Sequence, residues 1–354
     1  MKENCFDKNT SNMVKCIAII LMLMHHVIAN GRVDLLTSNF DILPSIINFS
    51  TRGRSCIAIF VFITAYGITS SFTNDRLMDI SQLGTTSIRR WIKLFFNYLF
   101  IYILTFVTSF LRDGGLKSVF NSGSRFVNII HIIINMLGLS ECFGTPTLNV
   151  TWWYMVLAYI FIFLVPLFIV IYRKIGVNII VISFLSFYIF PVSFDQWFLP
   201  ISLGVWAAEE NIFTKIHYSS ISKNRMINSF IIISLSSIGL LLGDAIADRL
   251  QLYDIPNGVA GFLLSLICVE IASYSFTSGI SKIMSFVGKH SMNMFLTHTL
   301  IYYVYFQEQI YSFRNWFLVL VATIISTLLL SIIIEWLKNV IDFYKFVSFC
   351  QSKV

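Results

Sequence analysis

The sequence predicts an all-α integral membrane protein, built as a bundle of about ten transmembrane helices. Of its 354 residues, 56% are hydrophobic and only 12% are charged, whereas a typical soluble domain has roughly 25% charged residues. The apolar residues form repeated long runs that no polar face interrupts, which is typical of helices that cross lipid. A transmembrane β-barrel is excluded because its strands alternate polar and apolar residues, and these Ile, Leu and Phe runs do not alternate.

Ten apolar runs are candidate spans, at 14–31, 55–73, 94–111, 152–172, 175–193, 196–208, 228–243, 256–274, 286–306 and 316–337. The first run holds Lys15 and two histidines and has no small-x-small cleavage site, so we interpret it as a retained span rather than a signal peptide. The sixth run is shorter than the roughly 17 residues that a span needs, and we expect it to be tilted, extended at its ends or re-entrant. Segment 126–139 is also short, and we expect it to lie in the interface or against the bundle.

The distribution of Lys and Arg predicts the orientation of these spans. With ten spans and both termini on the cytoplasmic side, about two-thirds of the 25 Lys and Arg residues fall inside, in agreement with the positive-inside rule. The longest polar connection, 112–151, then lies outside. We see no internal repeat and no linker, so residues 1–354 are expected to form a single polytopic domain with no extra soluble domain.

Charge and cysteine usage exclude several functions. The net charge is +7, but the basic residues gather at span ends and form no stripe with interleaved aromatic residues, so we expect no nucleic-acid partner. The six cysteines are scattered without CxxC or Cys/His spacing, so they indicate apolar packing rather than a metal or redox site.

Lys15 and His26 are the most informative pair of residues in the chain. They are eleven positions apart in one apolar run, and eleven α-helical steps bring two side chains to nearly the same face. Ionisable residues inside a span are energetically costly, and they are therefore functional candidates. His25 lies off this face, and we expect it to have a structural role.

Four segments together resemble the membrane-bound acyltransferase 3 family, along essentially the whole chain and in the family's order. KCIAIILMLMHH resembles the family's Arg/Lys-x10-His signature, with Lys15 and His26 in the two places. CIAIFVFITAYGI, followed by SIRRWIK, is similar to its Phe-Phe-x-x-Ser-Gly-Tyr span and basic run. LNVTWWYMVLAYIFIFLVPLF resembles its Trp-led span, and FVGKHSMNMFLTHTLI resembles its segment ending in Leu-x-His. Lys15 stands where Arg is commoner, and Arg90-x-x-Lys93 replaces Arg-x-x-Arg.

The resemblance implies transfer of an acyl group, often acetyl from acetyl-CoA, onto a sugar or another acceptor. Such a reaction needs a base for the acceptor hydroxyl, stabilisation of the oxyanion and a site for CoA. We expect His26 to be the general base because an imidazole titrates near neutrality. We expect His298 to orient an acceptor hydroxyl or support the site, although an interhelical hydrogen bond explains it equally well.

Basic and aromatic residues complete the predicted site. Lys15, Arg89, Arg90 and Lys93 lie near the cytoplasmic face on this topology, where they could bind the phosphates of CoA or act as ordinary positive-inside anchors. Arg54 is a candidate for a substrate or oxyanion contact, and Trp153 for stacking on a sugar. Glu270, a carboxylate in the middle of the eighth span, is either a structural ion pair or part of the cavity.

The sequence therefore predicts an O-acetyltransferase of the cell membrane, modifying a sugar of a cell-surface polysaccharide or its lipid-linked precursor. Its expected partners are acetyl-CoA as donor, the glycan acceptor and membrane lipid, with homo-oligomerisation left open and no metal required. A transporter or flippase for a lipid-linked sugar is the alternative, and it leaves the Lys-x10-His spacing unexplained. A catalytically silent partner in polysaccharide assembly is a third reading.

Overall fold

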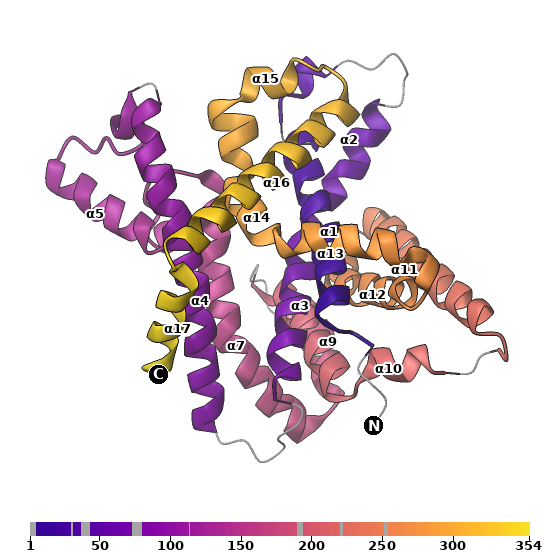
Figure 1. Ribbon diagram of the computed structural model, residues 1–354. Coiled ribbons are helices and arrows are strands. Elements are labelled where there is room, and N and C mark those ends of the chain that lie inside the picture. The colour runs from indigo at the N-terminus through magenta and orange to yellow at the C-terminus, as the bar shows by residue number, and fades with distance from the viewer. Residues whose placement is uncertain are drawn as a thin grey trace. The chain divides into compact units, whose positions relative to one another are not determined.

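The computed structural model of the chain describes residues 5–29, 31–36, 43–72, 80–112, 114–189, 194–219, 222–250 and 254–354. Within these ranges the regular elements are all helical (Figure 1). The α-helices are α1 (Lys8–Met24), α2 (Leu43–Thr51), α3 (Cys56–Ser70), α4 (Ile80–Thr108), α5 (Arg125–Met136), α6 (Ser140–Phe143), α7 (Tyr154–Ile175), α8 (Asn178–Ile189), α9 (Phe198–Glu209), α10 (Ile212–His217), α11 (Arg225–Leu250), α12 (Asp254–Ala272), α13 (Ser278–Lys289), α14 (Ser291–Thr299), α15 (Gln307–Tyr311), α16 (Trp316–Val340) and α17 (Phe343–Ser352). Two π-helical segments, His25–Ala29 and Leu300–Tyr305, extend α1 and α14.

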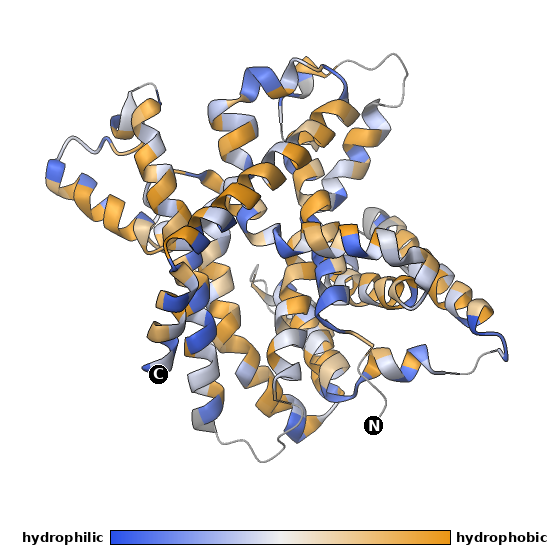
Figure 2. Cartoon of the chain, in the orientation of Figure 1, coloured by the Kyte–Doolittle hydropathy of each residue, from blue (hydrophilic) through white to orange (hydrophobic). Residues whose placement is uncertain are grey.

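Seven helical segments of the described chain are long and apolar enough to cross a membrane. They are Lys8–Ala29, Pro44–Ser70, Gln82–Leu111, Val150–Ile175, Arg225–Gly243, Asp254–Ala272 and Trp316–Val340. Apolar residues run along the length of α7 and α16 in Figure 2, as membrane-spanning helices require. The chain is therefore a multi-pass helical membrane protein.

The other three predicted spans take a different form. α8 and α9 have 12 residues each in the described chain, and run 286–306 is not one helix, because it breaks at His290 between α13 and α14. The number ten and the cytoplasmic position of both termini remain predictions. Segment 126–139 forms the 12-residue α5, whose exposed side chains include Phe126 and Ile129.

The first of two compact units comprises Met1–His25, Phe49–Met78 and Leu164–Ser291. Small residues let its helices approach closely, as is common in membrane bundles. A Cβ atom on Gly288 of α13 would lie 1.7 Å from the Asn12 carbonyl oxygen of α1. A Cβ atom on Gly204 of α9 would lie 2.7 Å from the Phe62 carbonyl oxygen of α3. Both positions therefore require glycine.

The second unit comprises His26–Asn48, Asp79–Phe163 and Met292–Val354. In it α17 lies along α4, where Phe343 and Val347 pack on Ile92 (Figure 1). The Tyr98 hydroxyl of α4 donates to the Asn135 carbonyl of α5 at 2.5 Å, and Ser87 donates to the Ile162 carbonyl of α7 at 3.0 Å. These contacts join segments of the second unit that are far apart in the sequence.

Candidate active site

His26 and His298 lie together in the second unit, with ring centroids 5.0 Å apart and ring planes at 48°. His26 is in the π-helix His25–Ala29, and His298 is in α14, two residues before the π-helix Leu300–Tyr305. π-Helical turns are rare and occur frequently at functional sites. The two predicted catalytic residues are thus brought side by side, one inside a π-helix and the other just before one.

Side-chain donors bind backbone carbonyl groups at both π-helical junctions. The Tyr311 hydroxyl donates to the Val27 carbonyl at 2.8 Å. Asn149 Nδ2 and Trp152 Nε1 both donate to the Leu296 carbonyl, at 3.1 and 3.0 Å. A π-turn disrupts the regular i→i−4 ladder, and a buried carbonyl without a partner is costly. These side chains therefore stabilise the irregular backbone around the histidine pair.

The hydrogen bond made by His298 defines its tautomer. The side chain is fully buried, and its Nδ1 lies 2.7 Å from the Phe295 carbonyl oxygen. A carbonyl oxygen only accepts, so Nδ1 carries the proton, and Nε2 of the neutral ring carries a lone pair. Within the described chain, Nε2 is buried without a hydrogen-bond partner. The arrangement leaves a proton-accepting nitrogen available beside His26.

Aromatic rings form the apolar side of this site. The Tyr302 ring stacks on His298 with centroids 5.9 Å apart, and the Phe295 ring lies at 6.1 Å. Trp152 is buried against Tyr98, with centroids 5.1 Å apart. Trp153, the residue predicted to stack on a sugar, is half-buried and contacts Tyr154 edge-on.

The predicted CoA-binding residues of α4 also belong to the second unit. Arg89 and Lys93 are exposed and Arg90 is half-buried. Gln351 of α17 donates to the Arg89 carbonyl at 2.7 Å, so α17 holds the backbone at this basic turn. Binding of the CoA phosphates by these cations stays a prediction.

Lys15 belongs to the first unit, where its Nζ donates to Asn12 Oδ1 at 3.3 Å. The predicted alignment with His26 assumed α-helical rotation along the whole run. The chain is π-helical from His25, and a π-helix turns less per residue because it has more residues per turn. The shared face of Lys15 and His26 therefore stays a prediction.

Arg54 lies in a 3₁₀ turn, Arg52–Ser55, that packs on the end of α1 in the first unit. A Cβ atom on Gly53 would lie 2.1 Å from the Leu21 carbonyl oxygen. His25 Nδ1 contacts the Ser50 carbonyl at 3.2 Å. Arg54 is exposed, and its contact with a substrate or an oxyanion stays a prediction.

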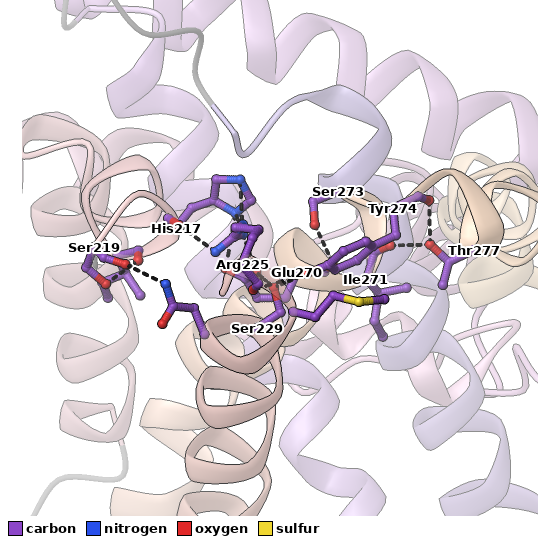
Figure 3. A network of polar contacts seen from close by, with 12 residues as sticks. His217, Ser219, Arg225, Ser229, Glu270, Ile271, Ser273, Tyr274 and Thr277 are labelled. Carbon is purple, nitrogen blue, oxygen red and sulfur yellow. Dashed lines mark hydrogen bonds and ion pairs between the residues drawn. The ribbon is translucent and has the colours of Figure 1, made fainter. Parts of the chain in front are cut away.

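Glu270 is the centre of a polar network in the first unit (Figure 3). Arg225 Nη2 lies 2.5 Å from one carboxylate oxygen, which also accepts from Ser229 at 2.7 Å. His217 Nδ1 lies 3.1 Å from the other oxygen. Of the two alternatives for this buried carboxylate, the structure contains the ion pair. Glu270 lies near the end of α12 (Asp254–Ala272), not in the middle of the span as the sequence suggested.

Two groups of polar residues were missed by the sequence analysis. Asn149 is buried in the segment that leads into α7 and bonds to Leu296 and Thr299. Only its place before a Trp-led span hinted at a role. Lys338, interpreted from sequence as a cation at a span end, is 1% exposed and donates to Asn97, Asn293 and Glu335 at 2.9–3.0 Å. Burial and the neighbouring Glu335 raise the pKa of Tyr344, whose hydroxyl donates to Glu335.

The nine predicted site residues divide between the units. Lys15, Arg54 and Glu270 lie in the first, whereas His26, His298, Arg89, Arg90, Lys93 and Trp153 lie in the second. Among the described residues, no three His, Cys, Asp or Glu side chains gather in a way that could hold a metal ion.

The fold and the histidine site define a multi-pass helical membrane protein in which a half-buried and a buried histidine lie side by side. The sequence model of the acyltransferase 3 family, described as an acyltransferase domain, matches residues 9–336. The chain therefore belongs to the acyltransferase 3 family, and it is a membrane acyltransferase. Comparisons with curated proteins and with solved structures found no match.

Proposed function

We propose that this membrane acyltransferase moves acetyl from acetyl-CoA to a sugar hydroxyl of a cell-surface polysaccharide or its lipid-linked precursor, in the cell membrane. The observation that carries the proposal is the pairing of His26 with His298, whose Nε2 is a buried proton acceptor. Acyl transfer to a hydroxyl needs such a group because the attacking oxygen must lose its proton.

His26 acts as the general base in this scheme. It takes the hydroxyl proton as the oxygen attacks the thioester carbonyl, and the C–S bond then breaks, so that CoA leaves as a thiol with that proton. While His26 is protonated, its second N–H donates to Nε2 of His298. This hydrogen bond stabilises the imidazolium, much as the acidic member of a Ser-His-Asp triad does.

Basic residues bind the donor. In the second unit, Arg89, Arg90 and Lys93 of α4 bind the phosphates of CoA. On the sequence alone, Lys15 is a further candidate for these phosphates, and Arg54 for the acceptor or the oxyanion. Trp153 stacks on the sugar acceptor. We assign Glu270 to the fold instead, because both its oxygens already contact Arg225, Ser229 and His217.

The test is transfer of radiolabelled acetyl from acetyl-CoA to glycan in membranes that contain the wild-type protein or His26→Ala at equal abundance. We expect label in the wild type and at least about a hundredfold less in the variant, since general-base catalysis supplies a 10²–10⁴-fold rate acceleration.

The matched control is His25→Asn, which should retain activity because the new amide can still donate to the Ser50 carbonyl. Equal label in His26→Ala contradicts the role of His26. Movement of the acceptor without CoA consumption favours a transporter.

A further inference from the structure

Two side chains hold one backbone carbonyl close to His298. The Leu296 oxygen accepts from Asn149 at 3.1 Å and from Trp152 at 3.0 Å. Both donors come from the segment that leads into α7, far from α14 in the sequence. The turn of α14 before His298 is therefore attached to a second element.

Asn149 also holds the residue after His298. Its Oδ1 accepts from the Thr299 hydroxyl at 2.6 Å, from the Thr151 hydroxyl at 2.8 Å and from the Thr151 backbone N–H at 3.0 Å. The amide is 2% exposed. Its orientation is determined, because a reversed amide would place NH₂ against the Thr151 N–H and oxygen against the Leu296 oxygen. One rigid side chain thus binds both flanks of His298.

We propose that Asn149 is a positioning residue, which holds the α-to-π junction of α14 so that Nε2 of His298 faces the reacting groups. This inference rests on the proposed function, in which His298 supports His26. A helical turn next to a π-segment has lost part of its ladder, so its orientation depends on outside bonds. Asn149 supplies these bonds to Leu296 and Thr299, and Trp152 adds one more.

A double-mutant cycle tests the proposal in the full-length protein in membranes. Asn149→Ala should lower kcat by about tenfold to a hundredfold, because small displacements of catalytic groups have effects of this size. KM for acetyl-CoA should change by less than about twofold, since no donor contact is removed. Trp152→Phe, which keeps an aromatic ring but loses the N–H donor, should have a smaller effect in the same direction.

The decisive comparison uses His298→Ala. If Asn149 acts through His298, the double variant should be no slower than His298→Ala alone. If the rate losses of the two single variants multiply in the double variant, the two residues act independently and the proposal is overturned. Asn228→Ala is the matched control: Asn228 is also a buried, multiply bonded asparagine, but of the first unit. It should lower abundance without changing kcat.

A second measurement needs no activity. In ¹⁵N spectra of histidine-labelled protein, with the His298 signals assigned by their loss in His298→Gln, we expect protonated Nδ1 and unprotonated Nε2. Asn149→Ala should produce a mixture of tautomers, whereas Asn228→Ala should not. An unchanged His298 spectrum in Asn149→Ala overturns the positioning role. If the wild type transfers no acetyl, the proposed function fails, and the spectra still decide whether Asn149 orients His298.

Discussion

Lys338 is a buried lysine in the last turn of the apolar helix α16. It makes hydrogen bonds of 2.9–3.0 Å to Glu335, Asn97 and Asn293, so it connects α16 with α4 and α14. Removing one partner of a buried ion pair leaves the other charge uncompensated, at a cost of about 3–5 kcal/mol. We therefore expect Lys338→Met to unfold at clearly lower temperature in detergent.

The matched control for this change is Lys345→Met. Lys345 pairs with Asp342 at 2.7 Å, but its side chain is 80% exposed, so its loss should cost below about 0.5 kcal/mol. Adding Glu335→Gln to Lys338→Met should recover part of the stability, because the uncompensated carboxylate disappears. Equal unfolding temperatures for Lys338→Met and Lys345→Met would argue against a structural role for Lys338.

A variant of Glu270 can show whether its carboxylate stabilises the fold or binds substrate. Glu270→Gln keeps the size of the side chain but removes the charge that faces Arg225 at 2.5 Å. We expect lower thermal stability and unchanged KM for the acceptor in the surviving protein. A large rise in that KM, with unchanged unfolding temperature, would return Glu270 to the acceptor site.

At the scale of elements, we expect alanine substitution at two glycines in neighbouring helices to have opposite effects on stability. A Cβ atom on Gly204 of α9 would lie 2.7 Å from the Phe62 carbonyl oxygen, whereas Gly67 of α3 has nothing within 4 Å of that position. Alanine in a helix interior is favoured over glycine by roughly 0.5–1 kcal/mol. Gly67→Ala should therefore raise the unfolding temperature, and Gly204→Ala should lower it because α3 and α9 must separate. A stabilising effect at both positions would refute close packing of these helices.

At the scale of the whole molecule, the number of crossings decides the position of the termini. Two termini on one side require an even number, but only seven described segments are long enough to span by themselves. The prediction of ten spans therefore needs crossings by the shorter helices α8 and α9 and by the broken run that contains His298.

Cysteine labelling in whole cells tests this topology. We expect a membrane-impermeant maleimide to label the exposed Cys142, in the predicted outer connection, before permeabilisation. In variants whose other cysteines are serine, Cys5 and an introduced cysteine in Ser352→Cys should react only after permeabilisation. Labelling of one terminus in intact cells would show an odd number of crossings and invert part of the predicted orientation.

The sequence by itself determined the membrane class, most of the long spans, the family and the two candidate catalytic histidines. These features are local, because apolarity, run length and motif spacing can be read without knowing which segments meet. Only the tertiary structure decided the pairing of His26 with His298, the bonds from Asn149 to both flanks of His298, and the ion pair of Glu270. Each joins residues more than 40 positions apart or depends on a π-turn, and packing between helices, rather than local propensity, determines where such a turn is stable.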